Sequence, residues 1–260
     1  MNKPAGTSVI IQDLIVAYGQ RVALRVPSLN LPAGRISAVI GPNGSGKSTL
    51  LDSIAGLVTP LNGSIAVLGH PPADVRRRVA YVLQGMSPNE VVPLTVNEVV
   101  TMGRYALRGT FRPLTSADRR AVTHAMQRLG IRSLGRRHLT ELSGGQRQRV
   151  YVAQALAQEG EVLLLDEPGS GLDLPAKERM ADILVEERDA GRTVVSTTHD
   201  VGEAAEADFV VLLAREVVAA GPAPAVLNTS NLATTYGAPI DLPEAGTVVL
   251  ADARHPHHPS

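Results

Sequence analysis

The chain has 260 residues, a mass of 27.4 kDa and 25 acidic against 25 basic residues. A chain of this length can bury a full core, and 44% apolar with 19% charged residues argue against disorder. The lack of cysteine excludes disulfides, thiolate metal sites and cysteine nucleophiles. Because no run approaches the roughly 20 apolar residues of a membrane-spanning helix, we expect a soluble, cytoplasmic chain that takes any span from another subunit.

Strands dominate the first part of the chain. The short, mostly apolar run 35–40 predicts one strand, and the runs 8–18 and 63–68, rich in β-branched residues and bounded by Gly, Pro or Asn, predict strands around it. The run 79–83 is a further candidate strand. A helix is predicted over 49–56. Apolar residues at helical spacing then predict helices over 96–107 and 116–129. We interpret residues of about 85–158 as an inserted helical subdomain.

The second half alternates strands with helices. Strand-like runs at 162–165 and 193–197 alternate with helical stretches at 143–158 and 175–190. This order predicts a parallel sheet of the βαβ kind, followed by a last apolar run at 209–213.

The C-terminus forms a separate region. One domain over residues 1–237 is expected, followed by a flexible tail over 238–260. The tail string RHPHHP holds His255, His257 and His258, which could bind a divalent metal weakly. The prolines and the terminal position favour a frayed end instead.

Charge is segregated along the chain despite the neutral total. Residues 104–137 hold nine Arg against Asp118 alone, and residues 159–208 hold fourteen acidic against four basic residues. Two solvated faces of opposite sign are the favoured interpretation. A contact of the basic segment with an acidic partner loop or lipid headgroups is the alternative.

The segment GPNGSGKST, residues 41–49, fits the phosphate-binding pattern G-x-x-x-x-G-K-[ST] at every fixed position. It lies between a predicted strand and a predicted helix. Its glycines let backbone N–H groups turn toward phosphate oxygens, Lys47 meets the outer phosphates, and the Ser48 hydroxyl is placed to bind Mg²⁺. We therefore expect a nucleoside triphosphate, held by Gly41, Pro42, Asn43, Gly44, Ser45, Gly46, Lys47, Ser48 and Thr49.

Two acidic residues end the apolar run VLLLDE. A strand that leaves its sheet beside the phosphate loop would place Asp166 near the Mg²⁺ held by Ser48. Glu167 is then the expected base or water-orienting residue for in-line attack on the γ-phosphate.

A second anion-binding edge is predicted at LSGGQ, directly before a helical stretch. Ser143 suits an N-cap, and the two glycines leave N–H groups open at a helix N-terminus. The residues of this edge are Ser143, Gly144, Gly145 and Gln146.

With LSGGQ between a Walker A and a Walker B motif, the chain resembles the ATP-binding-cassette (ABC) ATPases, to about Gly237. The resemblance implies an α/β P-loop NTPase fold with a parallel-sheet RecA-like core, an antiparallel β subdomain and the inserted helical subdomain. It also implies ATP and Mg²⁺ as cofactors and ATP hydrolysis coupled to transport.

Further roles follow from this resemblance alone. Tyr18 resembles the aromatic residue that stacks on adenine. Gln84 resembles the Q-loop glutamine, a Mg²⁺ ligand and catalytic residue between the nucleotide and a membrane partner. Asp173 in SGLD resembles the D-loop aspartate, and His199 in TTHD resembles the switch histidine at the γ-phosphate. Because family cassettes stack head to tail, a homodimer with ATP bound is implied.

The cargo is indicated by a second resemblance. The run 82–105 resembles ATPases of zinc and manganese importers, in which P-x-T-V-x-[DE]-V-V-x-M-G-R follows the Q-loop. A single cassette without a fused membrane domain favours an importer, with two copies of this subunit, two transmembrane permease subunits and an external solute-binding protein. The chain would then lie at the cytoplasmic face of the membrane, and no nucleic acid is expected as a partner. Zinc is ranked first as the imported metal and manganese second.

Other cassette classes are weighed against this prediction. Importers of siderophores, haem and cobalamin share a similar run, and an efflux ATPase is the alternative within transport. The 119 positions from Lys47 to Asp166 (166 − 47) leave no space for the coiled coils of DNA-repair members. Members that act on ribosomes resemble two fused cassettes, whereas this sequence shows one. An ATPase of iron–sulfur assembly stays open as the alternative outside transport.

Overall fold

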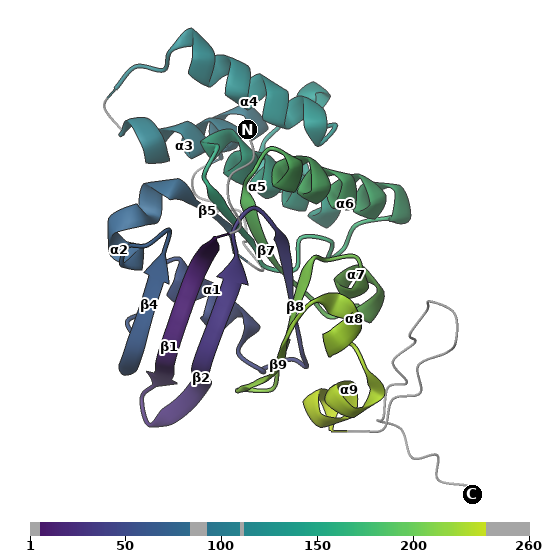
Figure 1. The fold of residues 1–260 in the computed structure, drawn as a ribbon. Coiled ribbons are helices and arrows are strands. Elements are labelled where there is room, and N and C mark those ends of the chain that lie inside the picture. The colour runs from purple at the N-terminus through teal and green to yellow at the C-terminus, as the bar shows by residue number, and fades with distance from the viewer. Residues whose placement is uncertain (1–5, 84–92, 110–111, 238–260) are drawn as a thin grey trace, which may run out of the picture.

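The computed structural model describes residues 6–83, 93–109 and 112–237 (Figure 1). A six-stranded sheet lies at its centre, in the order β5-β6-β7-β3-β8-β9. Five strands are parallel, and the edge strand β9, which the sequence did not predict, runs antiparallel to β8. Every residue of β3, β6 and β7 is buried, as expected for parallel strands covered on both faces. The bounds are β3 Ile36–Ile40, β5 Val79–Val82, β6 Val162–Leu165, β7 Thr193–Thr198, β8 Phe209–Leu213 and β9 Val217–Gly221.

The N-terminal strands form a second, antiparallel sheet in the order β2-β1-β4. The predicted runs 8–18 and 63–68 pair with each other here, so this sheet is the expected antiparallel β subdomain. A backbone hydrogen bond of 2.8 Å from the Arg25 N–H to the Arg215 carbonyl joins the two sheets. The bounds are β1 Thr7–Tyr18, β2 Arg21–Pro32 and β4 Asn62–Val67.

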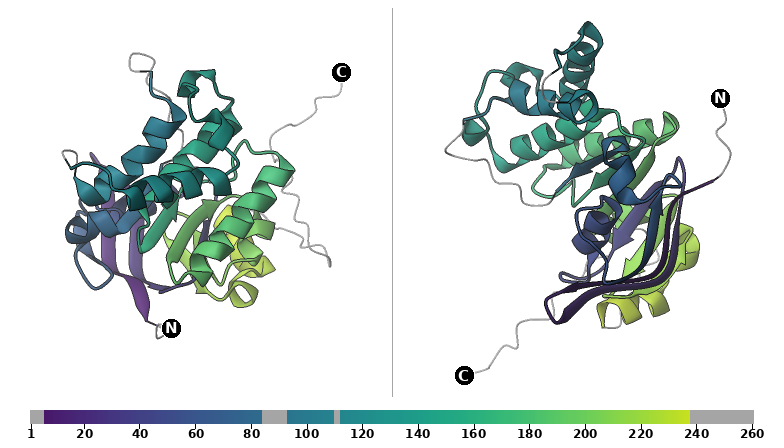
Figure 2. Two further views of the ribbon diagram at one scale, coloured as in Figure 1. Left: turned by 90° about the horizontal axis from the view of Figure 1, so that it is seen from above. Right: turned by 90° about the vertical axis from the view of Figure 1, so that its left-hand side faces the viewer.

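Helices cover both faces of the central sheet (Figure 1). The helices α3, α4 and α5 pack around a shared apolar cluster, at the opposite end of the molecule from the β1-β2-β4 sheet (Figure 2). Their bounds agree with the predicted helices to within one or two residues. The helices are α1 Lys47–Ile54, α2 Pro72–Val75, α3 Val96–Arg108, α4 Ser116–Arg128, α5 Gly144–Gln158, α6 Leu174–Asp189, α7 Val201–Ala205, α8 Ala223–Val226 and α9 Thr229–Tyr236, with 3-10 turns at Arg76–Arg78, Arg132–Leu134 and Leu139–Glu141.

No helix within the described ranges has the length and apolar character to cross a membrane.

Two consecutive residues of the M-G-R run explain how α3 packs. A side-chain carbon at Gly103 would collide with the backbone carbonyl of Gln154 on α5, so the two helices touch there backbone to backbone. The next residue, Arg104, is buried and donates to Asp118 at 2.9 Å and to Glu159 at 2.7 Å. Glycine and arginine at these positions therefore fix α3 against α5 and α4.

The charge segregation is satisfied in part within the chain. Arg128 at the end of α4 pairs with Glu186 at 2.7 Å and with the buried Glu187 at 2.5 Å, both on α6. Arg104 pairs with Glu159 across the same two segments. The interpretation of two solvated faces is therefore wrong for these residues, because the segments hold α4, α5 and α6 together.

Asp118→Asn is expected to destabilise the protein at neutral pH, because Asp118 is fully buried and pairs with Arg104 and Arg108. Hydrogen bonds from Thr115, and then from the two arginines, hold the pKa of Asp118 well below its usual range. Because the pKa of Asp118 is lower in the folded state than in the unfolded state, its ionised carboxylate stabilises the folded protein. This stabilisation is fully present above the unfolded pKa of about 3.9, and it is lost as the pH falls through the folded pKa. Urea unfolding should therefore show a larger deficit at pH 7 than at pH 3.

The matched control is Asp182→Asn, whose carboxylate is largely exposed and 3.8 Å from Arg179. It should change the unfolding free energy little at either pH. An Asp118→Asn deficit that stayed the same from pH 7 to pH 3 would contradict the prediction.

Candidate functional site

The phosphate loop joins β3 to α1. The helix begins at Lys47, two residues earlier than predicted, after Gly46 in a left-handed conformation with φ of 102°. A side chain at Gly41 would collide with the Leu213 carbonyl at the end of β8. These glycines let the backbone take a shape that a side chain would prevent, and the N-terminus of α1 faces the loop with its open N–H groups.

Lys47 is held over this loop. Its Nζ donates to the Gly41 carbonyl at 2.8 Å and to the Pro42 carbonyl at 3.3 Å, and the residue is 6% exposed. Burial lowers the pKa of Lys47, while the carboxylates of Glu167 and Asp166 act in the opposite direction. An ammonium group so placed can meet the outer phosphates of a nucleotide.

A cavity of about 590 Å³ opens at the loop. It brings together three groups that the sequence predicted separately: Tyr18, most of the phosphate loop and Glu167. Tyr18 is 54% exposed, so its ring is free to stack on a base. The lining residues are Tyr18, Arg21, Ala23, Asn43, Gly44, Gly46, Lys47, Ser48, Thr49, Glu167 and Arg215.

The sequence analysis missed two cations in this cavity. Arg21 begins β2, and Arg215 lies in the β8–β9 turn with φ of 65°. The Arg215 N–H donates to the Ser45 carbonyl at 2.8 Å, so this turn is attached to the phosphate loop. Neither arginine belongs to a local motif that could have identified it.

Asp166 and Glu167 follow β6. This strand is separated from the phosphate-loop strand β3 by β7. Asp166 is 2% exposed and accepts a 2.6 Å hydrogen bond from the Thr197 hydroxyl on β7. The Glu167 N–H donates to the same hydroxyl at 2.9 Å. Glu167 has a left-handed backbone with φ of 49°, uncommon for a residue with a side chain.

The residues at this place fit Mg²⁺. The Ser48 hydroxyl lies in the first turn of α1, and the Asp166 carboxylate acts electrostatically on neighbouring Lys47. Both are hard oxygen ligands, which Mg²⁺ prefers. The third predicted ligand, Gln84, lies outside the described residues, as does the histidine-bearing tail.

The LSGGQ segment forms the predicted helix N-terminus. The Ser143 hydroxyl accepts from the Gln146 N–H at 3.3 Å, and the Gln146 side chain accepts from the Ser143 N–H at 3.0 Å, which confirms Ser143 as the N-cap of α5. A side chain at Gly145 would come 3.0 Å from the Gly171 carbonyl. None of Ser143, Gly144, Gly145 and Gln146 lines the cavity at the phosphate loop.

Asp173 and His199 also lie outside that cavity. Asp173 caps α6 by accepting from the Ala176 N–H at 3.1 Å. His199 follows β7 directly and is exposed. Of the residues predicted to bind nucleotide, Tyr18, most of the phosphate loop and Glu167 therefore share one cavity. The LSGGQ residues and Asp173 lie outside it.

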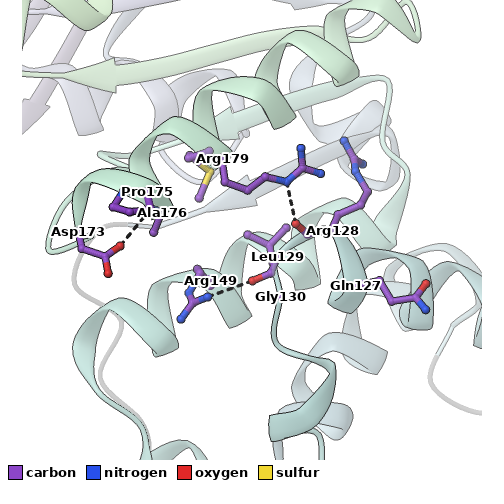
Figure 3. Close-up of a pocket in the computed structure, with 10 residues that line it drawn as sticks. Gln127, Arg128, Leu129, Gly130, Arg149, Asp173, Pro175, Ala176 and Arg179 are labelled. Carbon is purple, nitrogen blue, oxygen red and sulfur yellow. Dashed lines mark hydrogen bonds between the residues drawn. The ribbon is translucent and has the colours of Figure 1, made fainter.

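A second cavity, of about 450 Å³, lies beside Asp173 where α4, α5 and α6 meet (Figure 3). Its arginines are occupied with the end of α4: Arg149 donates to the Leu129 carbonyl at 3.3 Å, and Arg179 donates to the Arg128 carbonyl at 3.1 Å (Figure 3). These bonds satisfy carbonyls that the helix end leaves open. We therefore interpret this cavity as part of the packing between the three helices.

Comparisons with known proteins agree with this geometry. The sequence profile described as ABC transporter matches residues 24–170. The manganese transport system ATP-binding protein MntA of Synechocystis sp. is 38% identical over 88% of this chain and 90% of its own. The chelated iron transport system membrane protein YfeB of Yersinia pestis is also 38% identical, over 88% of this chain and 79% of its own.

Among solved structures, a transporter assigned to the metal-chelate type, in an inward-facing conformation, superposes with a TM-score of 0.77. It is 32% identical and covers 90% of both chains. The chain therefore belongs to the ABC transporter family, in which it is an ATP-binding, ATP-hydrolysing cassette.

Proposed function

We propose that this chain energises the import of a transition metal through separate permease subunits. The observation that carries the ATPase assignment is the cavity in which the phosphate loop, Tyr18 and Glu167 meet. The relatives named for metal transport support the cargo class.

The residues divide the work at the nucleotide. Tyr18 stacks on the base, the loop N–H groups and Lys47 hold the phosphates, and Ser48 with Asp166 would hold Mg²⁺. Held by these two residues, the ion would supply positive charge against the phosphate oxygens. Glu167 orients the attacking water and takes its proton. Gln84 and His199 keep their roles as predictions from the resemblance.

The LSGGQ residues do not line the cavity at the phosphate loop of their own chain, which supports a two-chain site. In a head-to-tail homodimer, the α5 N-terminus of one copy covers the phosphates bound by the other, with Asp173 at the contact. A bacterial ABC transporter cassette that is 27% identical, with a TM-score of 0.73, has a dimeric structure, which supports a site made by two chains.

Manganese is the first candidate cargo. The relatives reported above are named for manganese and for chelated iron, and none of them supports the ranking of zinc first. Chelated metal is the second candidate, since the inward-facing structure is assigned to the metal-chelate type. The external solute-binding protein and a place at the cytoplasmic face of the membrane belong to the same proposal.

Cellular metal content tests the cargo. Cells whose single copy carries Lys47→Ala should contain less manganese than wild-type cells under manganese limitation, with zinc unchanged. Elemental analysis under zinc and manganese limitation measures both. The matched control is Lys177→Ala, a partly exposed lysine of α6, which should retain wild-type metal content.

The other outcomes separate the alternatives. A selective fall in zinc would restore the first ranking from the sequence, and a rise in one metal would indicate efflux. Unchanged manganese and zinc, with co-purification of soluble scaffold proteins and no permease, would favour iron–sulfur assembly and contradict metal import.

A further inference from the structure

The strand β7 separates the phosphate-loop strand β3 from β6, the strand that leads to Asp166. Thr197 of β7 lies opposite Val39 of β3 and is fully buried. We propose that Thr197 is a positioning residue, whose hydroxyl orients both acidic residues of the ATP site. The inference rests on the proposed function of that site.

The Thr197 hydroxyl is used in both directions. It donates its single proton to Asp166 Oδ1 at 2.6 Å and accepts from the Glu167 N–H at 2.9 Å. A hydroxyl–carboxylate bond this short is charge-assisted and among the stronger hydrogen bonds in proteins. It restrains the rotation of the Asp166 carboxylate, and so would set the direction from which that carboxylate could bind Mg²⁺.

The second bond acts on Glu167. Its left-handed backbone persists only where surrounding contacts hold it. The bond from its N–H to Thr197 is one such contact, and a 3.1 Å bond from the Ser170 N–H to the Glu167 carbonyl is another. Thr197 therefore ties the metal ligand and the water-orienting residue to one buried point.

The strand itself does not require a hydroxyl at this position. Valine has nearly the shape of threonine and suits a buried strand, so packing alone does not explain a buried polar group here. Thr193, at the other end of β7, shows a purely structural use: its hydroxyl accepts from the Gly34 N–H at 3.0 Å. The two threonines lie about 13 Å apart along the strand.

Thr197→Val tests the inference, with Thr193→Val as the matched control and Thr197→Ser as the rescue. Binding of a fluorescent ATP analogue is titrated in EDTA and at increasing Mg²⁺, and Mn²⁺ electron paramagnetic resonance with bound ADP reports the metal environment. Thr197→Val should bind nucleotide normally in EDTA, and should need at least about tenfold more Mg²⁺ for half-maximal enhancement of binding, as expected for loss of a hydrogen bond to a charged group.

The control variants isolate the hydroxyl. Thr197→Ser should restore the wild-type Mg²⁺ requirement and Mn²⁺ spectrum, and Thr193→Val should lower the melting temperature without changing either. If Thr197→Val does not fold, Thr197→Ala replaces it, because a smaller side chain fits the same space.

Three results would overturn the inference. They are a wild-type Mg²⁺ requirement in folded Thr197→Val, an equal change in Thr193→Val, and no rescue by Thr197→Ser. Wild-type protein that bound no ATP at all would overturn the proposed function itself, which separates the two failures.

Discussion

Lys47→Ala is expected to weaken ATP binding by at least about 100-fold, the loss of roughly two charge-assisted contacts to phosphate. The side chain is 6% exposed and held at the loop by two backbone carbonyls, so its charge is already in place for the phosphates. No other described lysine lines the cavity to replace it. Isothermal titration calorimetry with Mg-ATP measures the effect.

Lys177→Ala serves again as the control, because it removes a lysine charge outside the cavity. Circular dichroism verifies that both variants fold. ATP affinity equal to that of the wild type in folded Lys47→Ala would contradict the assignment of the phosphate loop.

Glu167→Gln is expected to slow hydrolysis by a factor of about 10² to 10⁴ and to leave ATP affinity close to that of the wild type. The amide keeps the size of the side chain, but it cannot take the proton of the attacking water. Because ATP then persists at the interface, the variant should accumulate as a closed dimer. Single-turnover hydrolysis and light scattering with Mg-ATP measure the two effects.

The matched control is Glu178→Gln on α6, which removes an exposed carboxylate outside the cavity. It should hydrolyse ATP at the wild-type rate. A Glu167→Gln protein that stayed monomeric with saturating Mg-ATP would argue against the two-chain site.

The elements that the sequence predicted well have strong local signals. The helix α5 starts after a cap with two reciprocal hydrogen bonds, and β6 is an unbroken apolar run. The strand β2 was not predicted, because its buried and exposed residues alternate imperfectly and Pro27 and Pro32 interrupt the pattern. Tertiary pairing with β1 holds β2 in place, and no local propensity shows it.

The site follows the same division. The phosphate loop and Glu167 were predicted from motifs, and they lie in one cavity. Arg21 at the start of β2 and Arg215 in the β8–β9 turn are far apart in the chain, so they come together at that cavity only after folding. Thr197 is the first residue of the TTHD motif, but that motif predicts a role only for its histidine, His199.

The close contact at Gly103 has a mechanical consequence. Because the backbones of α3 and α5 meet there with no side chain between them, we expect the two helices to move as one rigid unit. The helix α5 alone is about 22 Å long. One end of α5 is capped by Ser143, and the other leads into β6, the strand that Asp166 directly follows. We therefore expect a displacement of α3 to move both ends of α5.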